Sequence, residues 1–404
     1  MKTWLLALAT VCAAQAASAQ VDFFLVGSPT SVSGYTVTDI SEDGRVAVGV
    51  DGAGGVWRWQ RGVGVQSMPP INVPGGTGPC TIHNAFVSAD GMRVVGDAGG
   101  PQCNGRVYQL YQWNVGSPPT IGPANSGPYY YRVRGCSATG SVGGSVEDTG
   151  YYSMFSQAFF TFPDGAYDVN EPGCVPGDWI HSFGFGITPD GLVLGSVTDC
   201  DALQIGGIWR GGMSVTRLTQ VPIAGSWGAA VVISQTSRWT LATGWVAAVP
   251  PGSAATDISW DGSMVAANLA VGPTNAAAYV HSGGTPAVLR TELIATGVTQ
   301  VQNLQLVSAS AVSGDGRWMT GIAQLPTGQK QAYVARLPRI CGDIDFNNDG
   351  MFPDVLDIDA LITTMQGNVC SPPCDSIDFN ADGQYPDTVD IDAFLRVFSG
   401  GACF

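Results

Sequence analysis

A short phrase built around Asp-Gly recurs through the first 340 residues and constrains the possible fold more than any other feature. Five copies are plain: I-S-E-D-G-R-V-A-V-G (40–49), V-S-A-D-G-M-R-V-V-G (87–96), I-T-P-D-G-L-V-L-G (187–195), I-S-W-D-G-S-M-V-A-A (258–267) and V-S-G-D-G-R-W-M-T-G (312–321). Two weaker copies lie at 136–144 and 233–244. In each, Ser or Thr and Asp can bond the turn backbone, and Gly supplies a positive φ. Because apolar residues flank the turn on both sides, the phrase predicts a β-hairpin.

The aspartates of the five plain phrases are interpreted as turn residues and not as catalysts. An Asp side chain hydrogen-bonds the backbone two residues on, so a tight turn explains it without any reaction. These residues are Asp43, Asp90, Asp190, Asp261 and Asp315.

An aromatic strand follows these phrases along the chain. The segments are 56–59, 111–113, 158–160, 208–210, 278–280 and 332–334. Units of about 40–50 residues with several strands each are typical of a β-propeller or a similar repeat array. We count six clear units and a less regular seventh. The isolated strand at 21–25 is expected to complete the last unit and close a ring.

The Asp-Gly phrases resemble the extracellular repeats named for their His-Ala-Phe strand, and also the Ser-Pro-Asp-Gly turns of propellers related to the translocation protein TolB. In this chain the aromatic strand is mostly Ala-Phe or Ala-Tyr, with no preceding His. The resemblance implies a mainly β fold, with a β-propeller-like repeat domain of six or seven blades over residues 20–340.

The repeat region offers little sign of catalysis. Its three histidines lie in different units, and no nucleophile elbow, phosphate loop or C-x-x-C motif occurs. The best acidic cluster is an insertion, expected to be a solvated loop: Asp164, Asp168, Glu171, Asp178 and His181, near Asp199 and Asp201. The tyrosines at 129–131 and 151–152 could stack on sugars, but strand packing is their commoner use. We therefore assign no catalytic residue.

Two near-copies of one segment, 33 residues apart, lie in the last part of the sequence. The first is D-F-N-N-D-G-M-F-P-D-V-L-D-I-D-A-L-I (345–362), and the second is D-F-N-A-D-G-Q-Y-P-D-T-V-D-I-D-A-F-L (378–395). Oxygen side chains at the first, third and fifth places, followed by Gly, are what a Ca²⁺ loop requires. The pattern predicts two calcium loops, each followed by a helix.

One carboxylate must close each loop, and three candidates exist per copy. They are Asp354, Asp357 and Asp359 in the first copy, and Asp387, Asp390 and Asp392 in the second. Apolar residues at +1, +4, +5 and +8 from Asp357 and from Asp390 predict one continuous helix face. That register places these two carboxylates at the helix starts, where the dipole favours an anion. We therefore select Asp357 and Asp390, with one residue inserted near Pro353 and Pro386.

The segment 341–404 is strongly acidic, with twelve carboxylates and a single base, Arg396. Such crowding opposes compaction unless counter-ions are bound. Two Ca²⁺ ions would remove four of these charges.

The duplicated loop and helix resemble a dockerin module, in the variant form with flanking cysteines found on secreted planctomycete-type proteins. The resemblance covers 341–404 and implies a small, all-α, EF-hand-like pair that binds two Ca²⁺ and docks on a cohesin-type receptor. The implied ligands, with the seventh-place residues acting through backbone oxygen, are Asp345, Asn347, Asp349, Met351, Asp357, Asp378, Asn380, Asp382, Gln384 and Asp390.

Residues 1–19 are predicted to be a secretory signal. Lys2 supplies the positive end, 4–14 the apolar run, and 17–19 a small-residue cleavage site. The apolar run is too short to cross a bilayer, so no membrane span is expected. We expect a secreted protein that is extracellular or held at the cell surface. A net charge of −15 with two lysines argues against a nucleic-acid partner.

An oxidising compartment favours disulfides. In the repeat domain we expect the pairs Cys80–Cys103 and Cys174–Cys200, which leaves Cys136 over. The acidic segment holds Cys341, Cys370, Cys374 and Cys403. All three pairings of these four respect the duplication, so their connectivity stays open.

Two functions of different classes remain. The first is a non-catalytic secreted propeller that displays or binds a polysaccharide or protein and is anchored by its calcium module. The second is a carbohydrate-active hydrolase or lyase, because dockerins commonly carry such enzymes. Two facing carboxylates in a deep central cleft would favour the enzyme.

Overall fold

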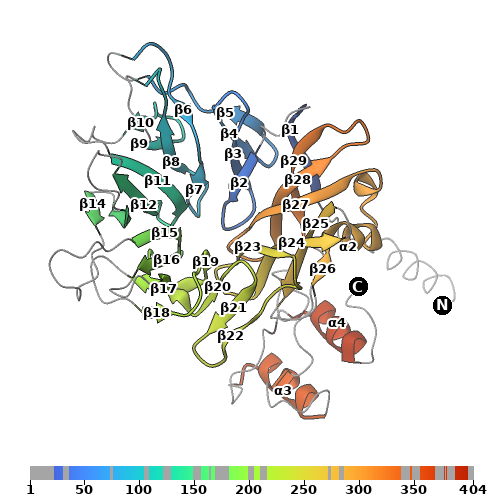
Figure 1. Ribbon diagram of the computed structural model, residues 1–404. Coiled ribbons are helices and arrows are strands. Elements are labelled where there is room, and N and C mark those ends of the chain that lie inside the picture. The colour runs from blue at the N-terminus through green and yellow to red at the C-terminus, as the bar shows by residue number, and fades with distance from the viewer. Residues whose placement is uncertain are drawn as a thin grey trace. The chain divides into compact units, whose positions relative to one another are not determined.

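The computed structural model describes residues 22–30, 36–72, 76–103, 109–121, 129–148, 156–162, 165–168, 182–198, 204–209, 216–271, 274–281, 286–337, 346–347, 355–368, 377, 379 and 387–398. The chain divides into two compact units, Met1–Leu337 and Pro338–Phe404. In the first unit the described segments are mainly β-strands (Figure 1).

The first unit contains seven antiparallel sheets, and their strands follow chain order. The first three sheets are β2–β5 (Thr36–Ile40, Val46–Val50, Val56–Gln60, Gly64–Ser67), β6–β10 (Thr81–Ile82, Phe86–Val87, Arg93–Gly99, Gln109–Asn114, Thr120–Ile121) and β11–β14 (Tyr129–Cys136, Val142–Asp148, Ser156–Phe162, Gly165–Asp168). The next three are β15–β18 (Ser182–Ile187, Val193–Thr198, Gln204–Trp209, Thr216–Leu218), β19–β22 (Ala224–Gly225, Val231–Ile233, Ser237–Thr240, Gly244–Ala247) and β23–β26 (Ala254–Ile258, Met264–Val271, Thr274–His281, Ala287–Val288). The seventh joins β27–β29 (Gln305–Val312, Trp318–Gln324, Lys330–Arg336) to β1 (Phe23–Thr30).

Each sheet contacts the next, and the seventh contacts the first, so the sheets form a closed ring (Figure 1). This is a β-propeller of seven sheets, and the predicted fold class is confirmed. Short helical segments accompany the sheets: η1 (Trp227–Ala229), α2 (Leu289–Ala295) and η2 (Thr299–Val301). The core lies between neighbouring sheets, where residues of adjacent sheets share apolar clusters.

The N-terminal strand closes the ring, as predicted. β1 pairs antiparallel with β29, with Phe24 opposite Val334 and Val26 opposite Ala332. Val26 is buried in a cluster that includes residues of the first and seventh sheets. The last sheet is therefore built from both ends of the repeat region.

The Asp-Gly phrases form the turns between the first and second strands, which confirms the turn interpretation. In all five plain phrases the Asp carboxylate accepts the hydroxyl hydrogen of the Ser or Thr two residues earlier. That hydroxyl oxygen in turn accepts a backbone N–H of the following strand, such as Val46 N–H at 3.0 Å from Ser41 Oγ. The weaker phrase at 136–144 forms the same turn, with Gly140 at a φ of 85°.

Hydrogen bonds between these turns run from sheet to sheet around one face of the ring. Backbone N–H groups donate from Glu42 to Ala89, from Ala89 to Ala138 and from Ala138 to Pro189. Pro189 has no N–H, and here the Asp190 carboxylate instead accepts the N–H of Gly228 at 3.0 Å. The chain of bonds continues from Trp227 to Trp260 and on to Gly314, and Asp315 N–H donates to Glu42. The turns thus make a continuous rim.

The weaker phrase at 233–244 forms a hairpin, as predicted, but at a different place in its sheet. Its residues 234–236 lie between β20 and β21, the second and third strands of the fifth sheet. The first turn is instead Ser226–Ala229, where the Asp-Gly pair is replaced by Gly228 and Ala229 at φ values of 63° and 52°. Ala229 is the one non-glycine residue with positive φ among those described. Without Asp-Gly the sequence carried no visible signal for this turn.

The aromatic segments form the third strands of six sheets, as their spacing predicted. Trp57, Trp209 and Arg58 are almost fully buried. Arg58 Nε donates to Gly91 O at 3.0 Å in the next sheet. These strands therefore fill the space between sheets.

The second unit contains two helices, α3 (Val355–Met365) and α4 (Thr388–Phe398), with the predicted phasing. Phe346, Phe379 and Phe394 are fully buried in one cluster, and Phe379 and Phe394 meet edge to face at 5.1 Å between ring centroids. The predicted apolar faces were too wide. Ile362 and Leu395, equivalent residues of the two copies, are each 47% exposed.

The predicted bond between Cys80 and Cys103 is present, and Cys136 is a free thiol. Cys174, Cys200 and the four cysteines of the acidic segment lie outside the described residues, as does the predicted secretory signal. Within the part of the chain that the structure describes, no helix has the length and hydropathy to cross a membrane.

Candidate functional site

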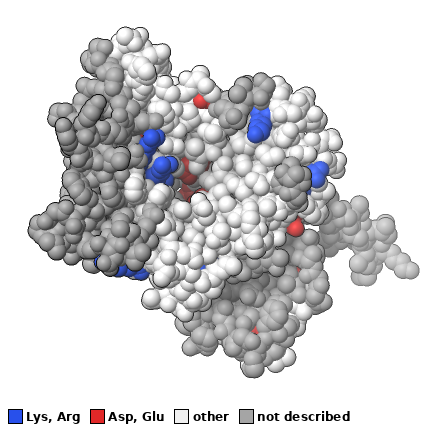
Figure 2. All heavy atoms as spheres, viewed as in Figure 1, with Lys and Arg blue, Asp and Glu red and all other residues white. Residues whose placement is uncertain are grey.

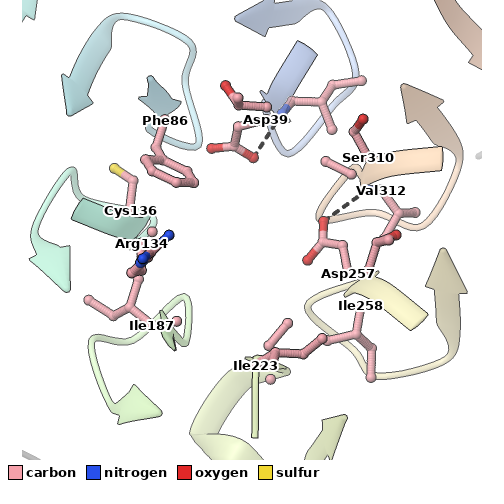
Figure 3. A pocket seen from close by; sticks show the side chains of 18 of the residues that line it. Asp39, Phe86, Arg134, Cys136, Ile187, Ile223, Asp257, Ile258, Ser310 and Val312 are labelled. Atoms are coloured by element: carbon pink, nitrogen blue, oxygen red, sulfur yellow. Dashed lines mark hydrogen bonds between the residues drawn. The ribbon is translucent and has the colours of Figure 1, made fainter. Parts of the chain in front are cut away.

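The first strands of all seven sheets line a cavity of about 220 Å³ at the centre of the ring. We call it the axial pocket. Figure 2 shows a hollowed face with acidic atoms inside the hollow and basic atoms near its edge. Figure 3 shows Asp39 and Asp257 at the border of the opening, with Phe86 beside Asp39 and with Arg134 and Cys136 across from Asp257. Rim residues Pro189 and Trp260 also line the pocket.

A β-bulge recurs in five of these first strands and explains which side chains reach the pocket. At each bulge one residue is skipped in the pairing with the second strand. Bulges re-aim side chains, so the skipped residue and its successor can both face the centre. The skipped residues that line the pocket are Thr38, Arg134, Phe185, Thr256 and Ser310.

Asp39 and Asp257 follow the skipped residue in the first and sixth sheets. Asp39 Oδ1 accepts Ile40 N–H, and its Oδ2 accepts Val87 N–H of the second sheet, both at 2.8 Å. Asp257 Oδ2 likewise accepts Val312 N–H of the seventh sheet at 2.9 Å. Each carboxyl group therefore links neighbouring first strands beside the pocket.

Desolvation in the narrow pocket raises the pKa of both carboxyl groups. It raises the pKa of Asp39 to about 8, against the lowering effect of the Val87 hydrogen bond, and the Asp257 charge adds to the rise. Burial raises the pKa of Asp257 to about 7, again against hydrogen bonds from Val312 and Ile258. Perturbed carboxyl groups in a cleft mark a candidate site.

These shifts predict a pH dependence of stability. Because folding raises both pKa values, the folded state holds more protons, so the free energy of unfolding should fall as pH rises from about 5 to about 8. The measurement is urea unfolding followed by Trp fluorescence, since every tryptophan precedes residue 338. Asp39→Ala should flatten the slope, whereas exposed Asp43→Ala should keep it. An equal slope in both variants would contradict the assignment.

Sequence reasoning missed Asp39 and Asp257 because each stands four residues before the Asp of a plain Asp-Gly pair and resembles an ordinary strand residue. The available signal was positional. The matching places in the other sheets hold Phe86, Gly135, Gly186, Ala224 and Ala311. Two of the seven sheets have an acid at this place and the other five have an apolar or small residue, a contrast that would have identified the pair.

In the second unit, Asp357 and Asp390 occupy equivalent places in the first turns of α3 and α4. Both residues are fully buried. Asp357 Oδ1 accepts the N–H of Asn347, a residue of the first predicted loop, at 3.3 Å. Each helix thus has one buried carboxylate in its first turn.

The rival carboxylates have other positions. Asp359 and Asp392 are exposed on their helices. Asp387 Oδ1 accepts the N–H groups of Val389 and Asp390, and Asp390 Oδ2 accepts Asp387 N–H at 3.1 Å. Asp387 is therefore the N-cap of α4, in a reciprocal capping arrangement. Asp354 lies outside the described residues.

A buried carboxylate requires hydrogen bonds or a cation to offset its desolvation. Two such groups at matching places fit the donor set of a hard cation such as Ca²⁺. Asp345, Asp349, Met351, Asp378, Asn380, Asp382 and Gln384 lie outside the described residues. Among the residues that are described, no group of three or more His, Cys, Asp or Glu is gathered for a metal.

The remaining sequence candidates contribute no site. The insertion cluster around Asp164 to His181, with Asp199 and Asp201, has no described side chain. Tyr131 is half-buried and packs beside Val95, Val133 and Val142, as strand packing predicts.

No protein-family model and no curated protein matches the sequence. A solved structure assigned as TolB from Agrobacterium tumefaciens has 14% identity and a TM-score of 0.38, over 75% of this chain and 90% of that chain. A streptogramin B lyase has 11% identity and a TM-score of 0.44, over 78% and 97%. Virginiamycin B lyase from Staphylococcus aureus has 10% identity and a TM-score of 0.41, over 77% and 99%. The assignment of a β-propeller rests on the sheet topology described above.

Proposed function

We propose that this chain is a secreted, non-catalytic β-propeller anchored to a partner by a C-terminal dockerin-like module that binds two Ca²⁺ ions. The observation that carries the proposal is the pair of fully buried carboxylates, Asp357 and Asp390, at equivalent places in α3 and α4. A duplicated loop rich in oxygen side chains precedes each of them. The propeller provides the body that displays or binds.

Within each loop the first, third and fifth residues would supply side-chain oxygens, with the seventh supplying a backbone oxygen. Asp357 and Asp390 would close the two sites from the helix starts. Bound Ca²⁺ would supply positive charge that offsets the acidic crowding and holds the loop against the helix. Asp387 caps α4 and is not needed as a ligand.

The proposed partner is a cohesin-like or cell-surface receptor outside the cell. Two features support this placement: the predicted signal at 1–19, and the disulfide between Cys80 and Cys103, which suits an oxidising compartment. The partner for the propeller itself is a polysaccharide or a protein in this proposal.

Calorimetric titration of the full chain with Ca²⁺ tests the metal sites. We expect two bound ions, with Asp357→Ala removing one and Asp390→Ala the other, because each loses the carboxylate that fills the coordination. Asp359→Ala and Asp392→Ala are matched controls, since these exposed carboxylates lie two residues further along the same helices. They should leave both ions bound. Equal binding by all four variants would refute the ligand assignment.

The second candidate is a glycan-acting hydrolase or lyase. One observation favours it: the axial pocket holds two carboxyl groups, the catalytic inventory of many glycosidases. Against it, the Asp39 carboxyl group already has a structural role: Oδ2 accepts the N–H of Val87 in the next sheet, and Oδ1 accepts the N–H of Ile40 in its own strand. A binding role therefore ranks first. Release of reducing sugar from a glycan, lost in Asp39→Ala and Asp257→Ala, would reverse that order.

A further inference from the structure

We propose that the axial pocket binds a small zwitterion, with its ammonium group beside Asp39 and Asp257 and its anionic group on Arg134. This inference concerns the propeller alone and is independent of calcium binding by the second unit. It rests on the placement of two acids, one tryptophan and one arginine around a single cavity.

The ring itself does not require the two carboxyl groups. At the matching place the other five sheets have Phe86, Gly135, Gly186, Ala224 and Ala311, and all of these sheets join the same ring. A hydrogen bond from this place to the next sheet is therefore optional for the fold. The sixth and first sheets flank the seventh, so both acids lie on one arc of the pocket.

The two carboxyl groups retain capacity for a ligand. Oδ1 and Oδ2 of Asp39 each accept one backbone N–H, whereas an ionised carboxylate can accept about four hydrogen bonds. The two acids also disfavour each other's charge, because the Asp257 charge raises the pKa of Asp39. An ammonium group between them would offset that repulsion and donate three hydrogen bonds.

Aromatic groups extend the acidic arc toward solvent. Trp260 lines the pocket, and its ring lies 6.1 Å from that of Trp227, measured between centroids. Trp227 is 55% exposed although it stands at the rim, where Ala89 and Ala138 occupy the same place in other turns. An indole face attracts a cation, so the pair suits the path of an ammonium group.

The basic pole is Arg134 on β11, in the third sheet. It is a bulge residue, it is exposed, and it lines the pocket across from Asp257 (Figure 3). Burial raises the pKa of Asp97 to about 6 and the Arg134 charge partly opposes that rise, but among the described residues no ion pair involves Arg134. A guanidinium binds a carboxylate through two parallel hydrogen bonds. Opposite charges that do not pair across a cavity leave room for a ligand that carries both.

Other ligand classes fit less well. A simple amine would leave Arg134 facing a positive ligand without compensation, and a simple acid would meet two carboxyl groups. A neutral glycan could stack on Trp260 but would not use the charges. The zwitterion is the class that meets both poles and the indole together.

The test titrates ω-amino acids, from glycine to ε-aminocaproate, into the full chain. Binding is followed by calorimetry and by the fluorescence of the pocket tryptophan. Because the two poles are fixed, we expect one length to bind about tenfold or more tightly than the alkylamine and the fatty acid of equal length. Arg134→Gln should lower its affinity to that of the amine, and Asp257→Ala to that of the acid.

Alanine occupies the place of Asp257 in two other sheets, so the variant is compatible with the fold, and its melting temperature checks this. Arg45→Gln, an exposed arginine paired with Asp43 outside the pocket lining, is the matched control and should bind normally. The proposal fails if no length exceeds its amine, or if Arg134→Gln changes nothing. Binding of cellobiose without binding of any amino acid would identify a glycan site instead.

Discussion

Removal of residues 22–30 is expected to open the ring and to lower the free energy of unfolding of the propeller by about 5 kcal/mol or more. The deletion removes the fourth strand of the last sheet, leaves the edge of β29 unpaired and takes Val26 from a core shared by the first and seventh sheets. Gln331 Nε2 also loses its bond to Gly27 O, which measures 2.7 Å. Urea unfolding followed by Trp fluorescence measures the loss.

A point substitution gives the matched control. Val26 is 1% exposed and its neighbour Leu25 is 39% exposed, because successive strand residues face opposite sides. Val26→Ser should cost about 2–4 kcal/mol through lost packing and a buried hydroxyl, and Leu25→Ser less than about 1 kcal/mol. An unchanged midpoint in both the deletion and Val26→Ser would show that the ring closes by other means.

Chelation of Ca²⁺ is expected to unfold the helical unit while the propeller stays folded. The core of this unit is small, centred on Phe346, Phe379 and Phe394, and the segment 341–404 carries twelve acids and one base. At a free Ca²⁺ concentration 1,000 times Kd, each ion contributes about 4 kcal/mol, so two ions equal the whole stability of many small domains. Circular dichroism at the helical band should fall on chelation with disulfides intact.

Different spectroscopic signals follow the two units, and this difference supplies the control. Every tryptophan precedes residue 338, so Trp fluorescence follows the propeller and should not respond to the chelator. Returning Ca²⁺ should restore the helical signal, and Asp357→Ala with Asp390→Ala should reproduce the chelated state. A helical signal and melting curve that persist without Ca²⁺ would end the calcium proposal.

The propeller could be predicted from sequence because its turns are set locally. Ser41, Asp43 and Gly44 bond and bend their own backbone, so the phrase survives in each repeat whatever surrounds it. The first turn of the fifth sheet was not foreseen because it lacks Asp-Gly and is held in part by the Asp190 carboxylate, 38 residues away. Tertiary bonds of this kind leave no local pattern.

The axial pocket could not be predicted for a related reason. Asp39 and Asp257 line one pocket only when the ring closes. The bulges at Thr38 and Thr256 turn these two side chains toward the centre. A sequence pattern that assumes strict alternation along a strand misses the one-residue shift that a bulge introduces. In the helical unit, by contrast, the phasing around Asp357 and Asp390 was correct because helix period is local, whereas the exposure of Ile362 and Leu395 was not foreseen.

The pairing of β1 with β29 also determines when the last sheet can form during folding. Phe23 must wait for Ala335, its partner more than 300 residues later, before the last sheet can assemble. Contacts of such long sequence separation slow folding, and until then an unpaired strand edge is open to association with other chains. During synthesis the protein would therefore be most prone to association with other chains while the ring is still open. The yield of folded protein should therefore depend on how soon that edge is covered. A chaperone can cover it, or β29 can pair with it as soon as the last repeat has been synthesised.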